Sequence, residues 1–340
     1  MKQYNISASP HLRDSVTIPK IMFTVSLTLV PAGIWSVYVF GIQALWVIMV
    51  SIAGAVITEI VCQKCMKRPV TILDGSAILT GLLLAYNLPP SVPLWIPAVG
   101  SFVAIFIGKQ IFGGLGYNLL NPALIGRAFL MASWPVYMTV YKTIPAGSKS
   151  LSGIDAITGG TPLALYKDMR GILIHRTDFL PEQVTNATET IYQLNRDYWK
   201  LLFGNVGGCL GEVSALLLFI GACFLLYKRI IGWKIPTAYI GTVAVLTFVF
   251  GGTEGLFTGN ALFHILSGGL FLGAFYMATD MVTSPVTFAG RIWFGVGCGI
   301  LTVIIRLWGG YPEGVCYSIL LMNLTVPLLN RATRPKTFGG

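Results

Sequence analysis

The feature of this sequence that most restricts its fold is a series of apolar segments, each near the length of about 20 residues that a bilayer-spanning helix needs. Ten such segments occur, at residues 20–41, 43–63, 70–88, 93–112, 122–140, 209–228, 235–251, 258–279, 289–308 and 313–329. The mean hydropathy is +0.73, and 11% of the residues are charged, compared with about 25% in soluble domains. We therefore predict an all-α polytopic membrane protein with about ten transmembrane helices.

The positions of Lys and Arg predict the orientation of the helices, because short cytoplasmic connections are enriched in these residues. With the N-terminus on the cytoplasmic side, 14 of the 23 basic residues fall in cytoplasmic segments. None falls in the short outer connections, at residue 42 and residues 89–92, 252–257 and 309–312. Both termini are thus predicted to be cytoplasmic. We attribute the net charge of +10 to this bias and not to nucleic-acid binding.

One long polar stretch, residues 141–200, interrupts the apolar segments. It contains seven basic and six acidic residues, and the predicted orientation places it outside the cytoplasm, where long loops escape the rule on basic residues. A site reached from outside is expected here. The chain is therefore predicted to consist of a membrane repeat, an extracytoplasmic loop, a second membrane repeat and a cytoplasmic tail, at residues 1–140, 141–208, 209–330 and 331–340.

The apolar segments also indicate an internal repeat, because a shift of about 192–196 residues places the first five segments on the last five. Thr80-Gly81-Leu82 then falls near Leu272-Gly273-Ala274, and Gly113-Gly114 falls near Gly309-Gly310. Because each unit has an odd number of spans, the two units have opposite orientations, as in the inverted repeats of many transporters. A chance match between apolar segments is the alternative.

The external loop contains the sequence Asp155-Ala156-Ile157-Thr158-Gly159-Gly160-Thr161-Pro162-Leu163. Gly159 and Gly160 permit positive φ values and Pro162 interrupts regular structure, so one interpretation is a simple loop turn. No His or Lys lies beside Thr161 in the sequence, which argues against a catalytic nucleophile. An exposed threonine next to glycines can instead accept a group from another enzyme that approaches the backbone closely.

The segment Asp-x-x-Thr-Gly-Gly-Thr, which ends at Thr161, resembles the D-x-x-[S/T]-G-A-[S/T] signal at which a flavin transferase attaches FMN. Gly160 stands where that signal usually has Ala. The chain around it resembles the RnfD family of membrane subunits from the Rnf ion-translocating ferredoxin:NAD oxidoreductase complex and, more distantly, the related membrane subunit (NqrB) of the sodium-pumping NADH:quinone reductase. The matching stretches span nearly the whole chain: Asp74-Gly75-Ser76-Ala77, Gly81-Leu82-Leu83, Gly116-Tyr117-Asn118, Asn121-Pro122-Ala123, Arg127-Ala128-Phe129, Gly207-Gly208, Gly211-Glu212, Met277-Ala278-Thr279-Asp280, Thr283-Ser284-Pro285-Val286-Thr287 and Gly309-Gly310-Tyr311-Pro312-Glu313-Gly314.

This resemblance implies FMN bound through its phosphate to Thr161, with Asp155, Thr158, Gly159 and Gly160 forming the transferase signal. It also implies ten spans in a 5+5 inverted repeat and, as in the relatives, a second, non-covalent flavin, riboflavin. The implied function is a flavoprotein subunit of a translocase in the bacterial inner membrane, which passes electrons while Na+ or H+ crosses. Such a subunit is not expected to be active alone. The implied partners are a flavin transferase, iron–sulfur subunits, a second subunit with covalent FMN and the other subunits of the complex.

A flavin ring needs an apolar or aromatic slot with a few polar groups at one edge. Asn118, Asn121 and Arg127 are candidates on one side of such a pocket. The candidates on the other side are Thr279, Asp280, Thr283 and Ser284. Each of these residues has an equally good alternative role as a helix cap or in a hydrogen bond between helices.

Acidic residues in apolar segments mark an ion path or a polar pocket, because an ionised group in hydrocarbon costs several kcal/mol. Asp74 and Glu212 are the leading candidates for the ion path. Glu59 and Glu313 fit either an ion path or the membrane interface. The sequence does not choose between Na+ and H+.

Other motifs point away from chemistry within this chain. There is no P-loop or GxGxxG motif, so NAD and ferredoxin chemistry is assigned to partner subunits. Cys62-x-x-Cys65 is a single pair, and His11, His175 and His264 show no ligand spacing, so no metal site is predicted. The alternative function is a solute transporter or channel on the same inverted repeat without redox chemistry.

Overall fold

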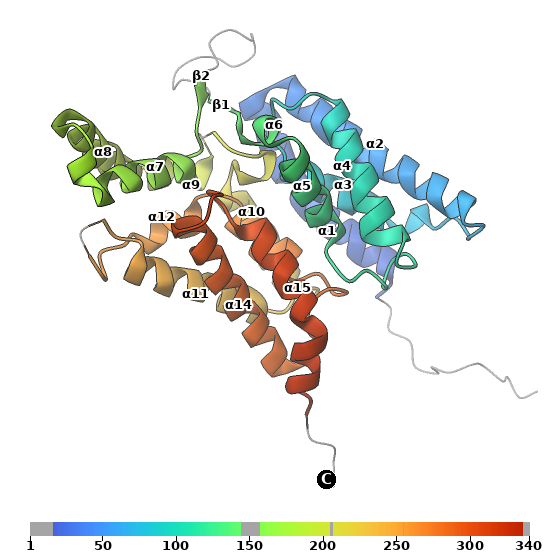
Figure 1. The fold of residues 1–340 in the computed structure, drawn as a ribbon. Coiled ribbons are helices and arrows are strands. Elements are labelled where there is room, and N and C mark those ends of the chain that lie inside the picture. The colour runs from blue at the N-terminus through green and yellow to red at the C-terminus, as the bar shows by residue number, and fades with distance from the viewer. Residues whose placement is uncertain (1–15, 144–156, 205–206, 254, 336–340) are drawn as a thin grey trace, which may run out of the picture.

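A computed structural model describes residues 16–143, 157–204, 207–253 and 255–335. Helices make up most of these residues and form two groups, one from each half of the chain (Figure 1). The first group contains α1 (Ile18–Phe40), α2 (Ile42–Cys65), the short turn η1 (Ile72–Asp74), α3 (Ser76–Tyr86), α4 (Trp95–Ile105), the π-helical turn η2 (Phe106–Gln110), α5 (Pro122–Ser133) and α6 (Pro135–Thr139).

The second group follows the loop region. The loop contains β1 (Tyr141–Thr143), β2 (Ile157–Gly159), α7 (Pro162–Ile174), η3 (Arg176–Asp178), α8 (Pro181–Leu194), α9 (Tyr198–Phe203) and η4 (Leu210–Glu212). The second group then comprises α10 (Ala215–Tyr227), α11 (Lys234–Phe250), α12 (Ala261–Leu266), α13 (Leu270–Leu272), the π-helical turn η5 (Gly273–Met277), α14 (Phe288–Leu307) and α15 (Val315–Ala332).

Each of the ten predicted apolar segments contains helix in the structure. Four helices, α1, α2, α14 and α15, are long and apolar enough to cross a membrane by length and composition. The other apolar helices are shorter, and two of the predicted segments are broken. Gly75 and Gly268 lie at these breaks with φ values of +74° and +71°, a conformation that glycine adopts without the penalty of a side chain. The chain is therefore a helical, multi-pass membrane protein with interrupted helices.

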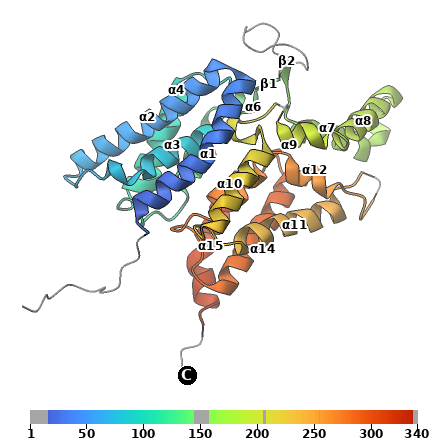
Figure 2. The ribbon, with the colours of Figure 1, turned by 180° about the vertical axis from the view of Figure 1, so that it is seen from behind.

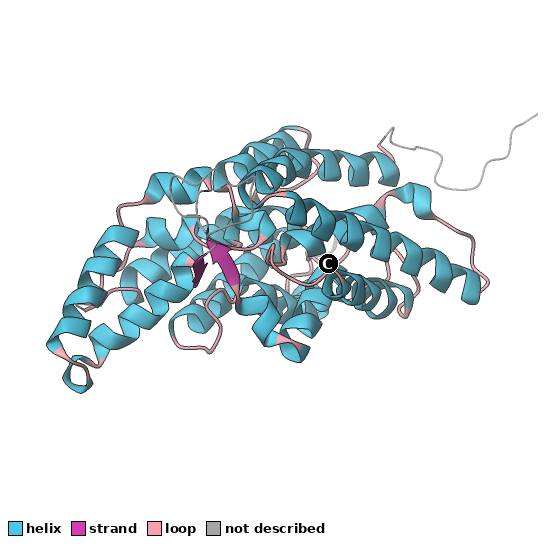
Figure 3. Cartoon of the chain, turned by 90° about the horizontal axis from the view of Figure 1, so that it is seen from above, coloured by secondary structure: helices cyan, strands magenta, loops and turns pink. Residues whose placement is uncertain are grey.

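The loop region departs from the all-α prediction in one place. Within the described residues, β1 and β2 form a single antiparallel ladder, in which Tyr141 pairs with Gly159 and Thr143 with Ile157 (Figure 3). The ladder is three residues long on each strand, too short for the alternating pattern that identifies a strand in a sequence. Its position matters because β2 leads directly to Thr161 and α7.

Helix packing follows the same scheme in the two halves. In the first half α2 packs against α3 and α4, and α4 packs against α5. In the second half α11 packs against α12 and α14, and α14 packs against α15. Close approach of α3 to α2 requires a glycine, because a Cβ atom at Gly81 would lie 2.7 Å from the Cα of Ile52. The halves meet where α1 contacts α10 and α5 contacts α15 (Figure 2).

The outer surface of the helices is apolar, as a bilayer requires. On α1, Leu27 and Ile34 are 68% and 66% exposed, and similar side chains cover α2. Exposed apolar area of this extent marks a membrane or protein interface. The polar side chains that the helices bury, among them Glu59 and Arg127, therefore lie inside the bundle and away from lipid.

The loop helix α7 is attached to the ends of the membrane helices by two basic side chains. Arg170 donates to the carbonyl of Phe250 at 2.9 Å and to that of Leu307 at 3.4 Å. Lys167 donates to the carbonyls of Gly309 and Tyr311. Burial lowers the pKa of both Lys167 and Arg170. Unpaired carbonyls at the ends of α11 and α14 are thus satisfied from the loop.

We expect Arg170→Ala to loosen this attachment. The substitution leaves the carbonyls of Phe250 and Leu307 without these donors, at a cost of about 1–3 kcal/mol. Limited proteolysis should then cleave the loop faster, and the unfolding temperature in detergent should fall. Arg176→Ala is the matched control, because Arg176 is exposed and donates only to Leu173, three residues before it. Equal effects of the two changes would contradict the assigned role of Arg170.

Candidate functional site

Thr161 lies at the N-cap of α7, and only 2% of the residue is exposed. Its Oγ1 accepts a hydrogen bond from the backbone N of Ala164 at 3.1 Å, which stabilises the first turn of the helix. The expectation of an exposed threonine is therefore wrong, because α7 packs onto the bundle and buries its own cap. The position nevertheless suits a phosphate, since the free amides and the dipole of a helix N-terminus attract anions.

The rest of the loop motif is described only in part. Gly160 is half-buried between β2 and Thr161. Thr158 and Gly159 belong to β2, where their backbones pair with Lys142 and Tyr141. Asp155 lies outside the described residues. The structure thus orders the part of the motif nearest to Thr161 through the ladder on one side and α7 on the other.

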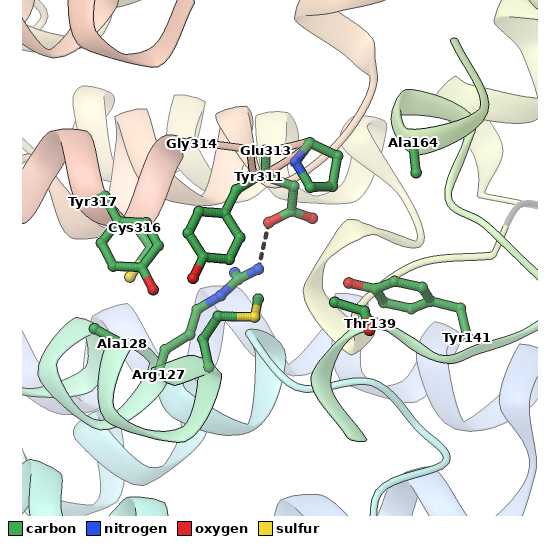
Figure 4. Close-up of a pocket in the computed structure, with 12 residues that line it drawn as sticks. Arg127, Ala128, Thr139, Tyr141, Ala164, Tyr311, Glu313, Gly314, Cys316 and Tyr317 are labelled. Carbon is green, nitrogen blue, oxygen red and sulfur yellow. Dashed lines mark hydrogen bonds and ion pairs between the residues drawn. The ribbon is translucent and has the colours of Figure 1, made fainter. Parts of the chain in front are cut away.

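A cavity of about 200 Å³ lies beside the first turn of α7 (Figure 4). Ala164, whose amide caps against Thr161, is part of its wall. Tyr311 and Tyr317, whose ring centroids are 5.1 Å apart, also line it. Its wall is mostly apolar and aromatic, and charge enters only through Arg127 and Glu313. A planar aromatic group attached to Thr161 would find this kind of surface next to its attachment point.

The inner wall of this first cavity contains a buried ion pair. Arg127 of α5 contacts Glu313, which lies just before α15, and Figure 4 shows the two side chains pointing toward each other across the cavity wall. Arg127 also donates to Oδ1 of Asn87 at 2.5 Å. Only 4% of Arg127 and 7% of Glu313 are exposed. The alternative that Glu313 lies at the membrane interface is therefore wrong.

Glu212 belongs to the same cluster, as its place among the ion-path candidates anticipated in part. Carboxylate oxygens of Glu212 and Glu313 and the sulfur of Cys209 all lie within 4.8 Å of one another. One oxygen of each carboxylate has no hydrogen-bond partner among the described residues. Arg306 lies beside them and donates to the backbone carbonyl of Glu313 at 3.0 Å. Two guanidinium groups and two carboxylates make the cluster neutral overall.

Two of these residues differ from their predicted settings. Glu212 was expected inside a helix beginning at residue 209, but it ends the turn η4, and α10 begins only at Ala215. Asp74 was expected within the third span, but it lies in η1 before α3 and is half-buried. The carboxylate of Asp74 accepts from the backbone N of Ser76 at 2.8 Å. Asp74 and Glu212 therefore belong to different parts of the bundle.

A second, smaller cavity of about 60 Å³ brings together residues from both predicted sides of the flavin pocket. Asn118, Asn121 and Asp280 line it. Asn121 also caps α5 by accepting from Ala123 and Leu124, so the alternative of a helix cap holds for this residue.

The remaining candidates stand apart from the lining of this second cavity. Thr279 donates to the carbonyl of Phe275 at 2.6 Å, and Thr283 donates to the carboxylate of Asp280 at 3.0 Å. Arg127 lines the first cavity. Thr279 and Thr283 thus make hydrogen bonds within their own segment.

The second cavity also adjoins a charged pair that the sequence analysis missed. Lys109 and Glu59 are 2% and 0% exposed, and their Nζ and Oε1 atoms lie 2.7 Å apart. Lys109 was counted as a charge in a cytoplasmic connection, which is wrong, because it lies in η2 inside the bundle and lines the cavity. Tyr276 of η5 lines the same cavity. Both π-helical turns therefore place a side chain there, as such turns often do at functional sites.

A signal for this pair was present in the sequence. Lys109 falls within the predicted span 93–112 and Glu59 within the span 43–63, so both lie inside apolar segments. An ionisable residue in a span needs a partner, and one cation and one anion in two neighbouring helices provide it.

The fold and the site together define a class of protein, a multi-pass helical membrane protein whose two halves enclose buried charged clusters next to a capped loop threonine. Comparison with known proteins is more specific. Residues 5–339 match the model of the NQR2, RnfD, RnfE family. The chain belongs to this family.

Its relatives, all of the RnfD type, cover almost the whole chain. The relative from the proton-translocating ferredoxin:NAD(+) oxidoreductase complex of Clostridium ljungdahlii is 49% identical over 336 residues, which is 99% of this chain and 96% of the relative. The relative from the Na(+)-translocating ferredoxin:NAD(+) oxidoreductase complex of Acetobacterium woodii is 45% identical, covering 98% of this chain and 95% of the relative. The relative from an ion-translocating oxidoreductase complex of Stutzerimonas stutzeri is 40% identical, covering 95% and 92%.

Proposed function

We propose that this chain is a membrane-integral flavoprotein subunit of an ion-translocating ferredoxin:NAD oxidoreductase complex, with FMN esterified to Thr161. The observation that carries the proposal is the position of Thr161, at a helix N-terminus and beside an aromatic cavity, in a chain that is 49% identical to an RnfD protein. FMN supplies a group that accepts and donates electrons. NAD and ferredoxin bind to partner subunits, so the isolated chain is not active alone.

The residues around Thr161 fit each part of FMN. The hydroxyl of Thr161 provides the ester oxygen, and the first-turn amides of α7 face the phosphate. Tyr311 and Tyr317 offer aromatic surface to the ring, and Arg127 offers a positive charge. Because Thr161 is 2% exposed, the flavin transferase acts before α7 packs against the bundle.

A denaturing gel tests this proposal. A covalently bound flavin remains on the polypeptide and gives a fluorescent band, and mass spectrometry then locates it on a peptide that contains Thr161. A solute transporter or channel of the same fold gives no fluorescent band. Subunits that co-purify with the chain, including iron–sulfur subunits and a second subunit with covalent FMN, identify the complex.

A second, non-covalent flavin, riboflavin, is proposed at the second cavity. Asn118, Asn121 and Asp280 offer the polar groups that one edge of the ring needs. At about 60 Å³ the cavity is well below the roughly 300–1,000 Å³ of ligand pockets, so its walls must move apart to admit the ring, and no step is assigned to it. Chromatography of the flavin released on denaturation tests the proposal, which requires riboflavin in the supernatant.

The ten-span inverted repeat is also proposed, on the basis of matching contacts in the two halves. Lys109 and Arg306 both lie near the end of the fourth helical segment of their half, and both reach the break in the third. Lys109 donates to Ser76 at 2.6 Å, and Arg306 donates to the carbonyl of Ser267 at 3.3 Å. The two halves also share the packing scheme of their helices and a π-helical turn each.

The proposed orientation places both termini in the cytoplasm of a bacterium and the 141–208 loop outside its inner membrane. Asp178 is exposed in the loop, and Lys228 is exposed after α10, on the opposite side of the proposed topology. In a variant without native cysteines, an impermeant thiol reagent should label Asp178→Cys in intact cells and Lys228→Cys only after lysis. The reverse pattern would refute the orientation.

Asp74 and Glu212 are proposed as residues of the ion path, which carries Na+ or H+. Both are carboxylates inside or beside the bundle, and Glu212 has an oxygen without a partner among the described residues. If they belong to the path, Asp74→Asn and Glu212→Gln should keep the flavin band and weaken ion translocation more than uncoupled electron transfer. Unchanged translocation in both variants would remove them from the mechanism.

A further inference from the structure

Three side chains form a directed chain of hydrogen bonds from the second cavity to the protein surface. Nζ of Lys109 donates to Oγ of Ser76 at 2.6 Å, and Oγ of Ser76 donates to Oδ1 of Asp74 at 2.5 Å. Each hydroxyl or ammonium proton therefore points toward the next residue. Lys109 and Ser76 line the cavity, and Asp74 is half-buried next to Leu73, which is 89% exposed.

Glu59 holds Lys109 in this chain. Its Oε1 accepts from Lys109 at 2.7 Å and from Gln63 and Gln110 at 3.1 Å each, and its Oε2 has no partner among the described residues. The π-helical turn η2 brings two consecutive side chains, Lys109 and Gln110, to the same oxygen. An ammonium has three donors. Glu59 and Ser76 use two of them, which leaves one for a group in the cavity.

We infer that Lys109, Ser76 and Asp74 form a proton-transfer path between the second cavity and the aqueous surface at η1. In this path Lys109 gives one proton from Nζ to the group in the cavity, and its ammonium becomes an amine. One proton then enters from water at Asp74, passes through Oγ of Ser76 and restores the ammonium. Each residue returns to its initial state, and the path itself transfers no electron.

Electrostatics keeps this path charged at rest. An amine at Lys109 would leave the carboxylate of Glu59 buried and uncompensated, which is strongly unfavourable. The amine is therefore short-lived and is reprotonated as fast as Ser76 delivers a proton. A group in the cavity that gains negative charge draws the proton from Lys109, because the attraction between charges is strong at low dielectric. Asp280, which also lines the cavity, contributes a further carboxylate on the opposite wall.

The inference deepens the proposed function and rests on it in one respect, since it takes the cavity to hold a group that gains a proton on reduction. It selects H+ for the Asp74 route and adds Lys109, Ser76 and Glu59 to it. The cluster of Glu212 and Glu313 is separate from this route and does not enter the inference.

Ser76→Ala is the decisive variant. It removes the hydroxyl but keeps the ion pair of Lys109 and Glu59 and the bond from the backbone N of residue 76 to Asp74. Proton uptake by the purified complex is followed with a pH-indicator dye in weak buffer during rapid reduction by dithionite, and flavin reduction is followed by absorbance. We expect proton uptake to slow at least tenfold in Ser76→Ala, with unchanged flavin content and an unchanged first phase of flavin reduction.

Two controls isolate the hydroxyl. Ser76→Thr keeps a hydroxyl at this position and should take up protons at the wild-type rate. Thr80→Ala removes another hydroxyl that lines the same cavity, but Thr80 donates only to the carbonyl of Ser76 and lies outside the path, so uptake should not change. Asp74→Asn should slow uptake as Ser76→Ala does.

The results separate the path from its occupant. Wild-type proton uptake in Ser76→Ala, or equal slowing in Thr80→Ala, overturns the path. Absence of riboflavin from the wild-type complex, with uptake that still depends on Ser76, removes riboflavin as the occupant and leaves the path in place. Loss of the covalent FMN band would concern Thr161 alone, since none of these variants touches α7.

Discussion

Replacing Thr161 by alanine is expected to abolish the fluorescent flavin band of this chain completely. The hydroxyl is the ester oxygen in the proposed linkage, and no other side-chain oxygen occupies the N-cap of α7. The chain should still insert into the membrane, because the loss of an N-cap costs only about 0.5–2 kcal/mol. In-gel fluorescence, compared with the amount of chain on an immunoblot, measures the effect.

Two further variants separate the ester from the helix cap. Thr161→Asn keeps a side-chain oxygen that accepts from the first turn of α7 but has no hydroxyl, so it should give a stable chain without flavin. Thr161→Ser keeps both functions and should retain the band. A fluorescent band in Thr161→Asn, or a flavin mapped to Thr158, would show that Thr161 is not the attachment site.

Arg127→Met is expected to destabilise the membrane domain by about 3–5 kcal/mol, because it leaves the buried carboxylate of Glu313 without its guanidinium partner. The change also leaves Oδ1 of Asn87 without its donor. The unfolding temperature in detergent should fall sharply, and the inner wall of the first cavity should lose its positive charge. Arg331→Met is the control, since Arg331 is exposed at the end of α15 and a large effect is not expected there.

A double variant distinguishes the loss of the pair from the loss of packing. Replacing a buried ion pair by apolar side chains of similar size is often neutral or stabilising, so Arg127→Met combined with Glu313→Met should recover much of the stability. If the double variant is as unstable as the sum of the single variants, the two side chains do not act as a pair.

Hydropathy predicted the helices well for a physical reason. A segment in hydrocarbon must satisfy its backbone groups within a helix, so length and apolar composition alone identify it. The breaks at Gly75 and Gly268 were harder to place, because their segments remain apolar across the break and only the backbone conformation marks it. The two-stranded ladder before Thr161 is too short to leave a pattern.

The candidate site was predicted in its residue types but not in its pairings. Arg127, Glu212 and Asp280 were all singled out, yet nothing local in the sequence indicates that Arg127 meets Glu313, 186 residues away. Interpretation of Lys109 as a loop charge failed for the same reason, since its partner Glu59 lies on another helix. The burial of Thr161 depends on the docking of α7, which is again a long-range contact.

The two buried ion pairs set an order for the biogenesis of this protein. Glu59 and Lys109 are separated by 50 residues, so α2 leaves the ribosome well before the cation that neutralises its carboxylate. That pair lies within the first half, which can therefore complete its own charge balance while translation continues. Arg127 must wait for Glu313, and the inner wall of the first cavity closes only when the last helix has been synthesised. A chain released before α15 retains a guanidinium group without its carboxylate in the bilayer, a state that the membrane itself disfavours.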